Sequence, residues 1–233
     1  YRSTAPSVAW ASHRILRQCP EACLVVTPSD QAIQAEEAFQ RDIIRGLDFV
    51  SKKDGMLTLG VKPTRPEPGY GYIQMGKEVE NDVFEVQSFT EKPAREFARM
   101  FMQSGEFYWN TGLFLLNVQF ARNRFCELLP PVLRKFDADN PKFNPHEEAL
   151  FIRENFPLYP NLSIEHGILE SSNDVFVMQC HFGWADLGTW HGMYETMQKG
   201  ENDNVVIDSD VILEDSSNNI IKLPKGKLGV ING

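Results

Sequence analysis

The stretch from Cys23 to Val61 decides the fold class. It opens with the apolar run Cys23-Leu-Val-Val-Thr27 and closes with the apolar run Met56-Leu-Thr-Leu-Gly-Val61. Between them, apolar residues recur at helical spacing from Gln31 to about Val50. Short continuous apolar runs are typical of strands in the middle of a parallel sheet. The order strand, helix, strand therefore predicts an α/β domain whose mixed sheet is mainly parallel and flanked by helices.

The residues before this stretch predict a helix with no strand ahead of it. Ser3-Thr4-Ala-Pro6 offers a capping residue and a proline in the first turn, and the apolar spacing continues to about Cys19. The chain also begins at Tyr1 without an initiating Met. We therefore expect that a segment of the natural protein precedes this chain.

Beyond Val61 the pattern alternates between loops, strands and helices. Prolines and glycines from Lys62 to Tyr72 exclude regular structure and would let the backbone approach a ligand, although an ordinary loop is the alternative. A tight polar turn at Asn110-Thr111-Gly112 is expected to feed a strand, and residues 130–160 are expected to be helical pieces between prolines. The further expected strands lie over Val83–Glu91 and Val175–Gln179, and the strand after the polar turn ends at Leu116. Further helices are expected over Ala94–Ser104, over Val118–Leu129 and from Ser163.

The composition changes after Gly200. Short β pieces at Asn204-Val-Val-Ile, Asp210-Val-Ile-Leu and Asn219-Ile-Ile-Lys are joined by polar turns. We expect two domains, residues 1–200 and the start of an incomplete β domain at 201–233, with the β domain as a contact surface for a homo-oligomer. Three irregular pieces do not establish a β-helix.

Composition and charge restrict the classes of function. The net charge of −9 argues against a nucleic-acid surface, which needs a clustered basic face, but it permits small anionic ligands. Apolar runs fall short of a membrane helix, so no membrane partner is expected. Four scattered cysteines without metal spacing predict free buried thiols in a reducing cytoplasm.

Polar residues stand at the ends of the expected elements. In open α/β sheets, ligands bind in the crevice outside the carboxyl ends of the strands. We therefore expect one site to gather these residues, which are Asp30, Gly71, Glu91, Lys92, Asn110, Glu165 and Asp186.

Asp186 is the residue that most needs a partner. It lies in the aromatic and glycine-rich stretch from His181 to His191, where a bare buried carboxylate would be costly. One interpretation is a cap for the helix that begins at Thr189 or Trp190. The other is that Asp30 and Asp186 together hold one Mg²⁺, which prefers oxygen ligands and leaves positions for phosphates.

Three residues suit the chemistry of a sugar phosphate. Lys92 can act as a point charge on a phosphate, and Glu91 and Asn110 can accept and donate hydrogen bonds to sugar hydroxyls. The alternative for Lys92 is a solvated lysine paired with Glu91.

Seven strings in order carry a specific resemblance. They are Ser-Thr-Ala-Pro-Ser, Val-Val-Thr-Pro-Ser-Asp, Glu-Pro-Gly-Tyr-Gly-Tyr-Ile, Phe-Thr-Glu-Lys-Pro, Trp-Asn-Thr-Gly-Leu-Phe, Ser-Ile-Glu-His-Gly-Ile-Leu-Glu and Trp-Ala-Asp-Leu-Gly-Thr-Trp. This ordered set spans nearly the whole chain and resembles the sugar-1-phosphate nucleotidylyltransferases. The resemblance implies a Rossmann-like nucleotidyltransferase fold, and the best match within the family implies GTP and mannose 1-phosphate as substrates and GDP-mannose and pyrophosphate as products.

The resemblance also implies residue roles. Asp30 and Asp186 would bind Mg²⁺ together with the nucleotide phosphates, and Lys92 would contact the sugar phosphate, so that Lys92 and Asp186 are the expected catalytic residues. The expected substrate-binding residues are Thr4 near the nucleotide and Gly71, Glu91, Asn110 and Glu165 near the sugar.

The chain departs from the family pattern at several points. The family's glycine-rich triphosphate loop with its Arg is absent, which implies that this chain alone is inactive. Smaller departures are Ser3, where Asn is common, Gln31, where His is common, and Glu165-His166, where Asp-Tyr is frequent. The alternatives that stay open are another sugar-1-phosphate nucleotidylyltransferase using dTTP or UTP with glucose 1-phosphate, a metal-dependent glycosyltransferase, and a non-catalytic nucleotide-sugar-binding subunit.

Overall fold

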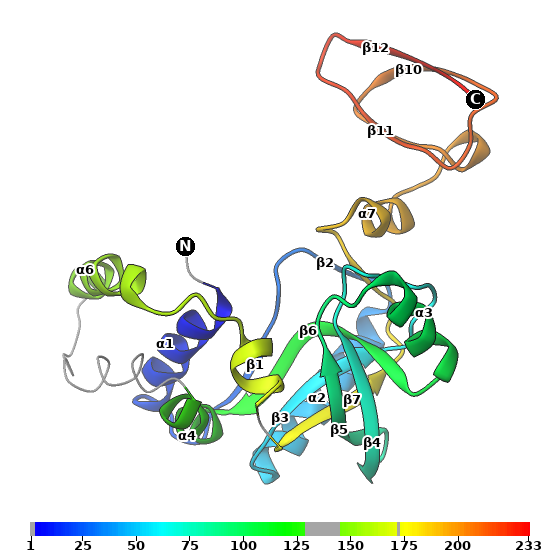
Figure 1. Cartoon of the computed structure of the whole chain (residues 1–233). Coiled ribbons are helices and arrows are strands. Elements are labelled where there is room, and N and C mark those ends of the chain that lie inside the picture. Colours follow the sequence, from blue (N-terminus) through cyan, green and yellow to red (C-terminus); the bar gives the residue numbers. More distant parts are fainter. Residues whose placement is uncertain (1–2, 129–144, 172) are drawn as a thin grey trace. The chain divides into compact units, whose positions relative to one another are not determined.

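The computed structural model describes residues 3–128, 145–171 and 173–233 (Figure 1). The chain forms two compact units: Tyr1–Pro28 with Glu36–Phe182, and Ser29–Ala35 with Gly183–Gly233. The expected boundary after residue 200 lies inside the second unit. The division into domains at 1–200 and 201–233 stays a prediction.

The first unit is built on a six-stranded sheet with the order β1-β6-β3-β7-β5-β4. The long strand β6 also pairs with β4, and in that register Tyr72 lies opposite Trp109. The strands are β1 (Cys23–Val26), β3 (Met56–Val61), β4 (Tyr72–Glu80), β5 (Val83–Thr90), β6 (Phe107–Asn117) and β7 (Val175–Cys180).

The α/β class, a mixed sheet with flanking helices, is confirmed, but the expected strand directions are not. Among the described strands of this sheet, β3 and β7 are the one parallel pair. β6 runs antiparallel to β1, β3 and β4, and β5 runs antiparallel to β4 and β7. β1 is an edge strand and not a central one. Its residues are only partly buried, and Val25 is 39% exposed, so the apolar run predicted a strand here but neither its burial on both faces nor its direction.

Helices pack on both faces of the sheet. Helix α2 (Glu36–Lys52) packs closely on one face, where a Cβ placed at Gly46 would lie 2.9 Å from Leu115 and 3.1 Å from Leu57. On the other face, alternate strand residues such as Met56 and Phe114 join the core of the remaining large helices. Those helices are α1 (Thr4–Leu16), α4 (Val118–Leu128) and α6 (Pro145–Asn155).

Helix α3 (Arg95–Ser104) is fastened by aromatic packing. The ring of Phe101 stacks on Phe107 of β6 at 4.1 Å between centroids and tilts against the fully buried Tyr72 of β4 at 5.5 Å. The helix ends at Gly105, whose φ of 76° is a left-handed conformation that glycine adopts without strain.

Several expected local structures were wrong. The triplet Asn110-Thr111-Gly112 lies inside β6, where it forms a bulge with Gly112 at φ 74° and does not reverse the chain. Residues Gln31–Ile33 form strand β2 and not the start of α2, and β4 was not predicted. By contrast, the helical pieces expected between prolines over 130–160 are confirmed where the structure describes them, as α6 (Pro145–Asn155) and a 3-10 turn, η1 (Phe156–Leu158); residues 130–144 lie outside the described residues.

The helix expected from Ser163 is a single π-helical turn, η2 (Glu165–Leu169), and its N-cap residue Ile164 makes no side-chain capping bond. The Ser163 hydroxyl accepts the backbone N–H of His166 at 3.3 Å. Single π turns are rare in proteins, and those that occur frequently lie at functional sites.

In the second unit, the antiparallel pair β2–β8 (Trp184–Asp186) precedes helix α7 (Trp190–Thr196) and a 3-10 turn, η3 (Glu201–Asp203). β9 (Val205–Ile207) pairs in parallel with β11 (Ile220–Lys222), and β10 (Asp210–Glu214) pairs in parallel with β12 (Leu228–Asn232). Because every second strand pairs in parallel, the chain makes two stacked coils. The sequence does not predict β12.

The cysteines are free, as expected, but not all are buried. Cys19 and Cys126 are exposed, and Cys180 is buried. Burial is the main cause that raises the pKa of the Cys180 thiol, and nearby Asp42 adds to it. No helix among the described residues is long and apolar enough to span a bilayer.

Candidate active site

The two predicted metal ligands come together in the second unit. β2 and β8 pair so that Gln31 lies opposite Asp186, and the backbone N–H of Leu187 donates to the carbonyl of Asp30 at 2.8 Å. A Cβ placed at Gly188 would lie 3.0 Å from Asp186 Oδ1 and 3.1 Å from Asp30 Oδ2. The two carboxylates therefore face one point, and the absence of a side chain at Gly188 keeps that point open.

The helix-cap interpretation of Asp186 is wrong. Thr189 caps α7, because its hydroxyl oxygen accepts the backbone N–H of Gly192 at 3.0 Å. Asp186 Oδ1 accepts the backbone N–H of Gly188 at 2.8 Å, a local turn that orients the carboxylate. The surroundings are less apolar than expected, since Asp186 is half-buried and Trp190 is 63% exposed.

The donor set fits a magnesium ion. Two carboxylates that face the same point offer oxygen ligands to a single hard cation. Among the described residues, no cluster of three or more His, Cys, Asp or Glu side chains suits a metal. Mg²⁺ is commonly held by one or two carboxylates, with water and substrate phosphates completing its shell, whereas a structural zinc needs four protein ligands.

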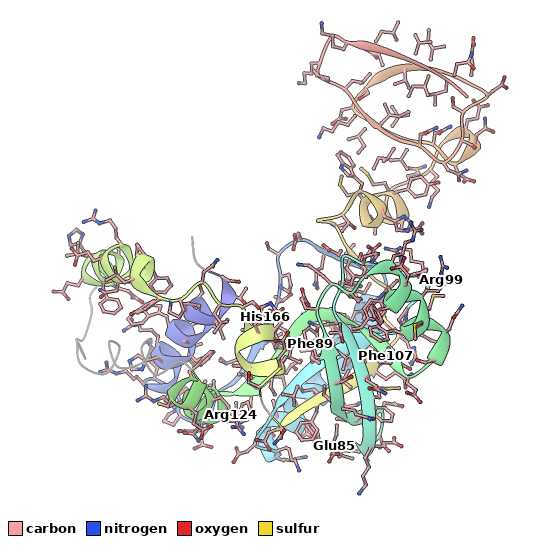
Figure 2. The ribbon with its side chains drawn as sticks, viewed as in Figure 1. Glu85, Phe89, Arg99, Phe107, Arg124 and His166 are labelled. Carbon is pink, nitrogen blue, oxygen red and sulfur yellow. The ribbon has the colours of Figure 1, made fainter. Side chains whose placement is uncertain are left out.

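In the first unit, the structure brings Gly71, Glu91 and Asn110 together. The backbone N–H of Asn110 donates to the carbonyl of Gly71 at 2.8 Å. A Cβ placed at Gly71 would lie 2.7 Å from Glu91 Oε2 and 2.9 Å from the ring of Phe89, which is labelled in Figure 2. Gly71 is thus required by packing, and its neighbours supply a carboxylate and an amide to the same small region.

The side chain of Asn110 is held in a defined orientation. Its Oδ1 accepts the backbone N–H of Gly112 at 3.2 Å and lies 2.9 Å from the Thr58 hydroxyl. Because a backbone N–H can only donate, the atom facing Gly112 is the oxygen, and the NH₂ group is left to point elsewhere. The β6 bulge therefore presents Asn110 as a hydrogen-bond donor, which suits a sugar hydroxyl.

Lys92 shows features of both of its interpretations. Its side chain is 65% exposed, and Nζ lies 3.4 Å from Glu91 Oε1, as a solvated ion pair would. Its backbone, however, has a φ of 46°, a left-handed conformation that is unfavourable for a residue with a Cβ. Such strain is retained where the surrounding structure requires it, and it is most frequent at binding sites.

Thr4 and Glu165 lie in neighbouring segments of the first unit. The Thr4 hydroxyl accepts the backbone N–H of Ile164 at 2.9 Å, and the N–H of Ala5 donates to the carbonyl of Leu162 at 3.0 Å. The start of α1 therefore holds the segment that leads into the π turn and Glu165. At this turn, His166 (labelled in Figure 2) lies 2.8 Å from a carboxylate oxygen of Glu170.

The structure divides the predicted site between the two units. Asp30 and Asp186 belong to the second unit, and Thr4, Gly71, Glu91, Lys92, Asn110 and Glu165 belong to the first. The convergence of both groups on one substrate stays a prediction. Sequence reasoning missed Gly188, since a glycine between Leu and Thr is ordinary, and it missed Thr58, which lies in the middle of a buried strand.

Comparisons with known proteins identify the family. The pattern of the nucleotidyl transferase family matches residues 1–203. A mannose-1-phosphate guanylyltransferase of Salmonella montevideo is 35% identical over 227 residues, covering 93% of this chain and 46% of that protein. One of Escherichia coli is 30% identical over 239 residues, covering 99% of this chain and 51% of that protein. The chain spans about half the length of these relatives.

A solved structure shows the same fold. It is described as mannose-1-phosphate geranyltransferase from Thermus thermophilus, and it matches with a TM-score of 0.83 at 24% identity, covering 100% of this chain and 65% of that chain. The family pattern covers most of the chain, and the fold agrees with it. The chain therefore belongs to the nucleotidyl transferase family.

Proposed function

We propose that the full-length protein transfers GMP from GTP to mannose 1-phosphate, forming GDP-mannose and pyrophosphate. The observation that carries this proposal is the pair of carboxylates, Asp30 and Asp186, facing one point beside Gly188. The names of the relatives support guanylyl transfer to mannose 1-phosphate in particular.

In the proposed reaction, a phosphate oxygen of mannose 1-phosphate attacks the α-phosphorus of GTP. The bond from that phosphorus to the bridging oxygen of the β-phosphate breaks, and pyrophosphate leaves with the electron pair. The attacking group is already an anion, so no general base is required. The protein's task is positioning and charge neutralisation.

Named residues perform these tasks. Asp30 and Asp186 would hold a Mg²⁺ ion, which when bound supplies neutralisation of the phosphate charge. Asn110 donates a hydrogen bond to a sugar hydroxyl, Glu91 accepts one, and the ammonium of Lys92 faces the sugar phosphate.

The remaining contacts are part of the same proposal. Gly71 and Glu165 complete the sugar contacts, and Thr4 lies near the nucleotide. We also propose that the protein acts in the cytoplasm and that residues 201–233 provide a contact surface for a homo-oligomer, with no nucleic acid or membrane as partner.

The experiment is a substrate panel on the full-length protein. GTP, dTTP and UTP are each paired with mannose 1-phosphate and glucose 1-phosphate in the presence of Mg²⁺, and pyrophosphate release is followed together with the nucleotide-sugar product. We expect GTP with mannose 1-phosphate to exceed every other pair at least about tenfold in kcat/KM.

Each other outcome supports a named alternative. Preference for dTTP or UTP with glucose 1-phosphate would replace the guanylyl assignment by another member of the family. Release of a free nucleoside diphosphate from a nucleotide sugar would indicate a glycosyltransferase. Binding without turnover on any pair would indicate a non-catalytic subunit.

A further inference from the structure

A cation lies over two buried aromatic rings in the loop that precedes β4. The guanidinium carbon of Arg65 is 5.1 Å from the ring centre of Trp109 and 5.8 Å from that of Tyr70. These two rings meet edge to face at 5.2 Å, and both are buried. A planar guanidinium can stack on aromatic faces while its edge still donates hydrogen bonds.

The edge of this guanidinium is bound to Glu67. Nη2 and Nε of Arg65 donate to Oε2 of Glu67 at 3.2 and 3.3 Å. The other carboxylate oxygen accepts the backbone N–H of Gly69 at 3.0 Å, and the backbone N–H of Glu67 donates to the hydroxyl of Tyr72 at 3.0 Å. Because Tyr72 is fully buried, these bonds attach the loop to the sheet.

Arg65, Glu67 and the rings of Tyr70 and Trp109 are here called the Arg65 clamp. This clamp lies directly beside the proposed sugar contacts. Tyr70 precedes Gly71 in the chain, and Trp109 precedes Asn110. The two following residues are joined by the Asn110 N–H donating to the Gly71 carbonyl at 2.8 Å. A shift of the rings under Arg65 therefore moves both proposed sugar contacts together.

We propose that Arg65, held by Glu67, is a positioning residue that sets the place of Gly71 and Asn110 and thereby the affinity for the sugar phosphate. This inference rests on the proposed function. Arg65 acts through the rings and the loop, because its Nε and Nη2 donate to the carboxylate of Glu67. A lysine keeps the charge but lacks the plane and the fork, so Arg65→Lys removes the clamp and leaves the charge in place.

The kinetic test uses Arg65→Lys and Glu67→Gln in the full-length protein. We expect each change to raise the KM for the sugar 1-phosphate by about three- to tenfold, from the strength of a partly buried cation–π and ion-pair contact. The KM for the nucleoside triphosphate and kcat should stay within about twofold. The double variant should show less than the product of the two single effects, because both remove one clamp.

Arg124→Lys is the matched control. Arg124, labelled in Figure 2, also lies over an aromatic ring, with its guanidinium carbon 5.4 Å from the centre of Phe120. It pairs with Glu127 at 2.9 Å and also with Asp174, and its side chain is 24% exposed against 26% for Arg65. It belongs to α4 and is not among the proposed substrate contacts, so its loss should leave all three kinetic constants unchanged.

A second measurement does not depend on turnover. Hydrogen exchange of the Asn110 amide, which donates to Gly71, should be faster in Arg65→Lys than in the parent protein and unchanged in Arg124→Lys. An unchanged sugar-phosphate KM in Arg65→Lys, or equal changes in all constants, would overturn the inference. If the parent protein turns over no sugar 1-phosphate, the proposed function fails, and the exchange rates alone decide whether Arg65 positions Asn110.

Discussion

At Asp186, hydrogen bonds decide between two roles that the sequence left open. Thr189 caps the start of α7, so the Asp186 carboxylate is not used as the cap. It accepts the backbone N–H of Gly188 and faces the same point as the Asp30 carboxylate. An acidic residue in an aromatic stretch signals a special role in the sequence itself. Its partner could be predicted only through topology, because no spacing rule relates Asp30 to Asp186.

The exchange of Asp186 for asparagine tests the metal role. Asn keeps the acceptor for the Gly188 N–H but removes the charge, so the fold should stay intact while Mg²⁺ binds less tightly. In the full-length protein we expect turnover at fixed Mg²⁺ to fall at least about a hundredfold, with the half-saturating Mg²⁺ concentration raised. Asp30→Asn should act in the same direction.

Asp210→Asn is the control for this change. Asp210 is an exposed carboxylate at the start of β10 in the same unit, and its loss should affect neither turnover nor Mg²⁺ dependence. Circular dichroism and the thermal midpoint should be close to those of the parent for all three variants. Normal Mg²⁺-dependent activity of Asp186→Asn would remove this residue from the metal site.

At the level of elements, the sequence predicts where strands form better than it predicts which strands pair and in which direction. Strands predicted over Met56–Val61 and Val175–Gln179 are confirmed as β3 and β7, and both are largely buried, because burial on both faces requires continuous apolar residues. Their partners depend on contacts between distant segments, which local patterns do not contain. The antiparallel insertion of β6 between β1 and β3 is such a contact.

The bulge in β6 shows the same limit for the site. Asn110-Thr111-Gly112 has the composition of a turn, and the sequence predicts one. In the sheet, however, the Thr111 hydroxyl donates to the carbonyl of Leu59, and the register shifts between Thr58 and Gly60. Tertiary pairing thus converts a turn signature into a bulge that orients Asn110.

The corner between β8 and α7 requires a glycine. A Cβ placed at Gly192 would lie 1.8 Å from the carbonyl oxygen of Asp186, far inside van der Waals contact. Gly192→Ala must therefore push α7 away from β8 and move Asp186. We expect a loss of at least about 2 kcal/mol in unfolding free energy, measured by chemical denaturation, together with reduced Mg²⁺-dependent turnover.

The comparison variant is Gly200→Ala. Gly200 has a φ of −93°, and a Cβ there would lie 3.4 Å from the Asn204 carbonyl oxygen, an ordinary contact. Its unfolding free energy should change by less than about 1 kcal/mol, with Mg²⁺ dependence unaffected. Equal effects of the two alanines would show that the close approach at Gly192 is not what fixes the corner.

At the scale of the whole molecule, the two compact units are stabilised differently. The first buries a large apolar core around its sheet. The second relies more on polar contacts between its stacked coils, and its exposed apolar residues include Ile212, Leu228 and Val230. Such a difference predicts that the coils open at lower free energy than the sheet.

Asn204 tests this prediction, because all four hydrogen-bonding positions of its side chain are used and three of them join it to the next coil. Its amide donates to the carbonyls of Glu201 at 2.9 Å and Ser216 at 2.8 Å. Its oxygen accepts from the backbone N–H and the side-chain amide of Asn219 at 3.1 and 3.0 Å. Asn204→Leu removes three part-buried hydrogen bonds and takes the donor from the buried bond to the Ser216 carbonyl, where an unpaired group costs about 1–3 kcal/mol.

Amide hydrogen exchange then separates the two units. In Asn204→Leu, the amides of β9 to β12 should lose protection, while those of β3 and β7 keep the protection of the parent protein. Asn232→Ala, which removes only an exposed bond to Glu214 at 3.2 Å, should change neither set. If β3 and β7 lost protection together with the coils, the chain would unfold as one cooperative body. Loss confined to the coils means that the sheet does not depend on them for its stability.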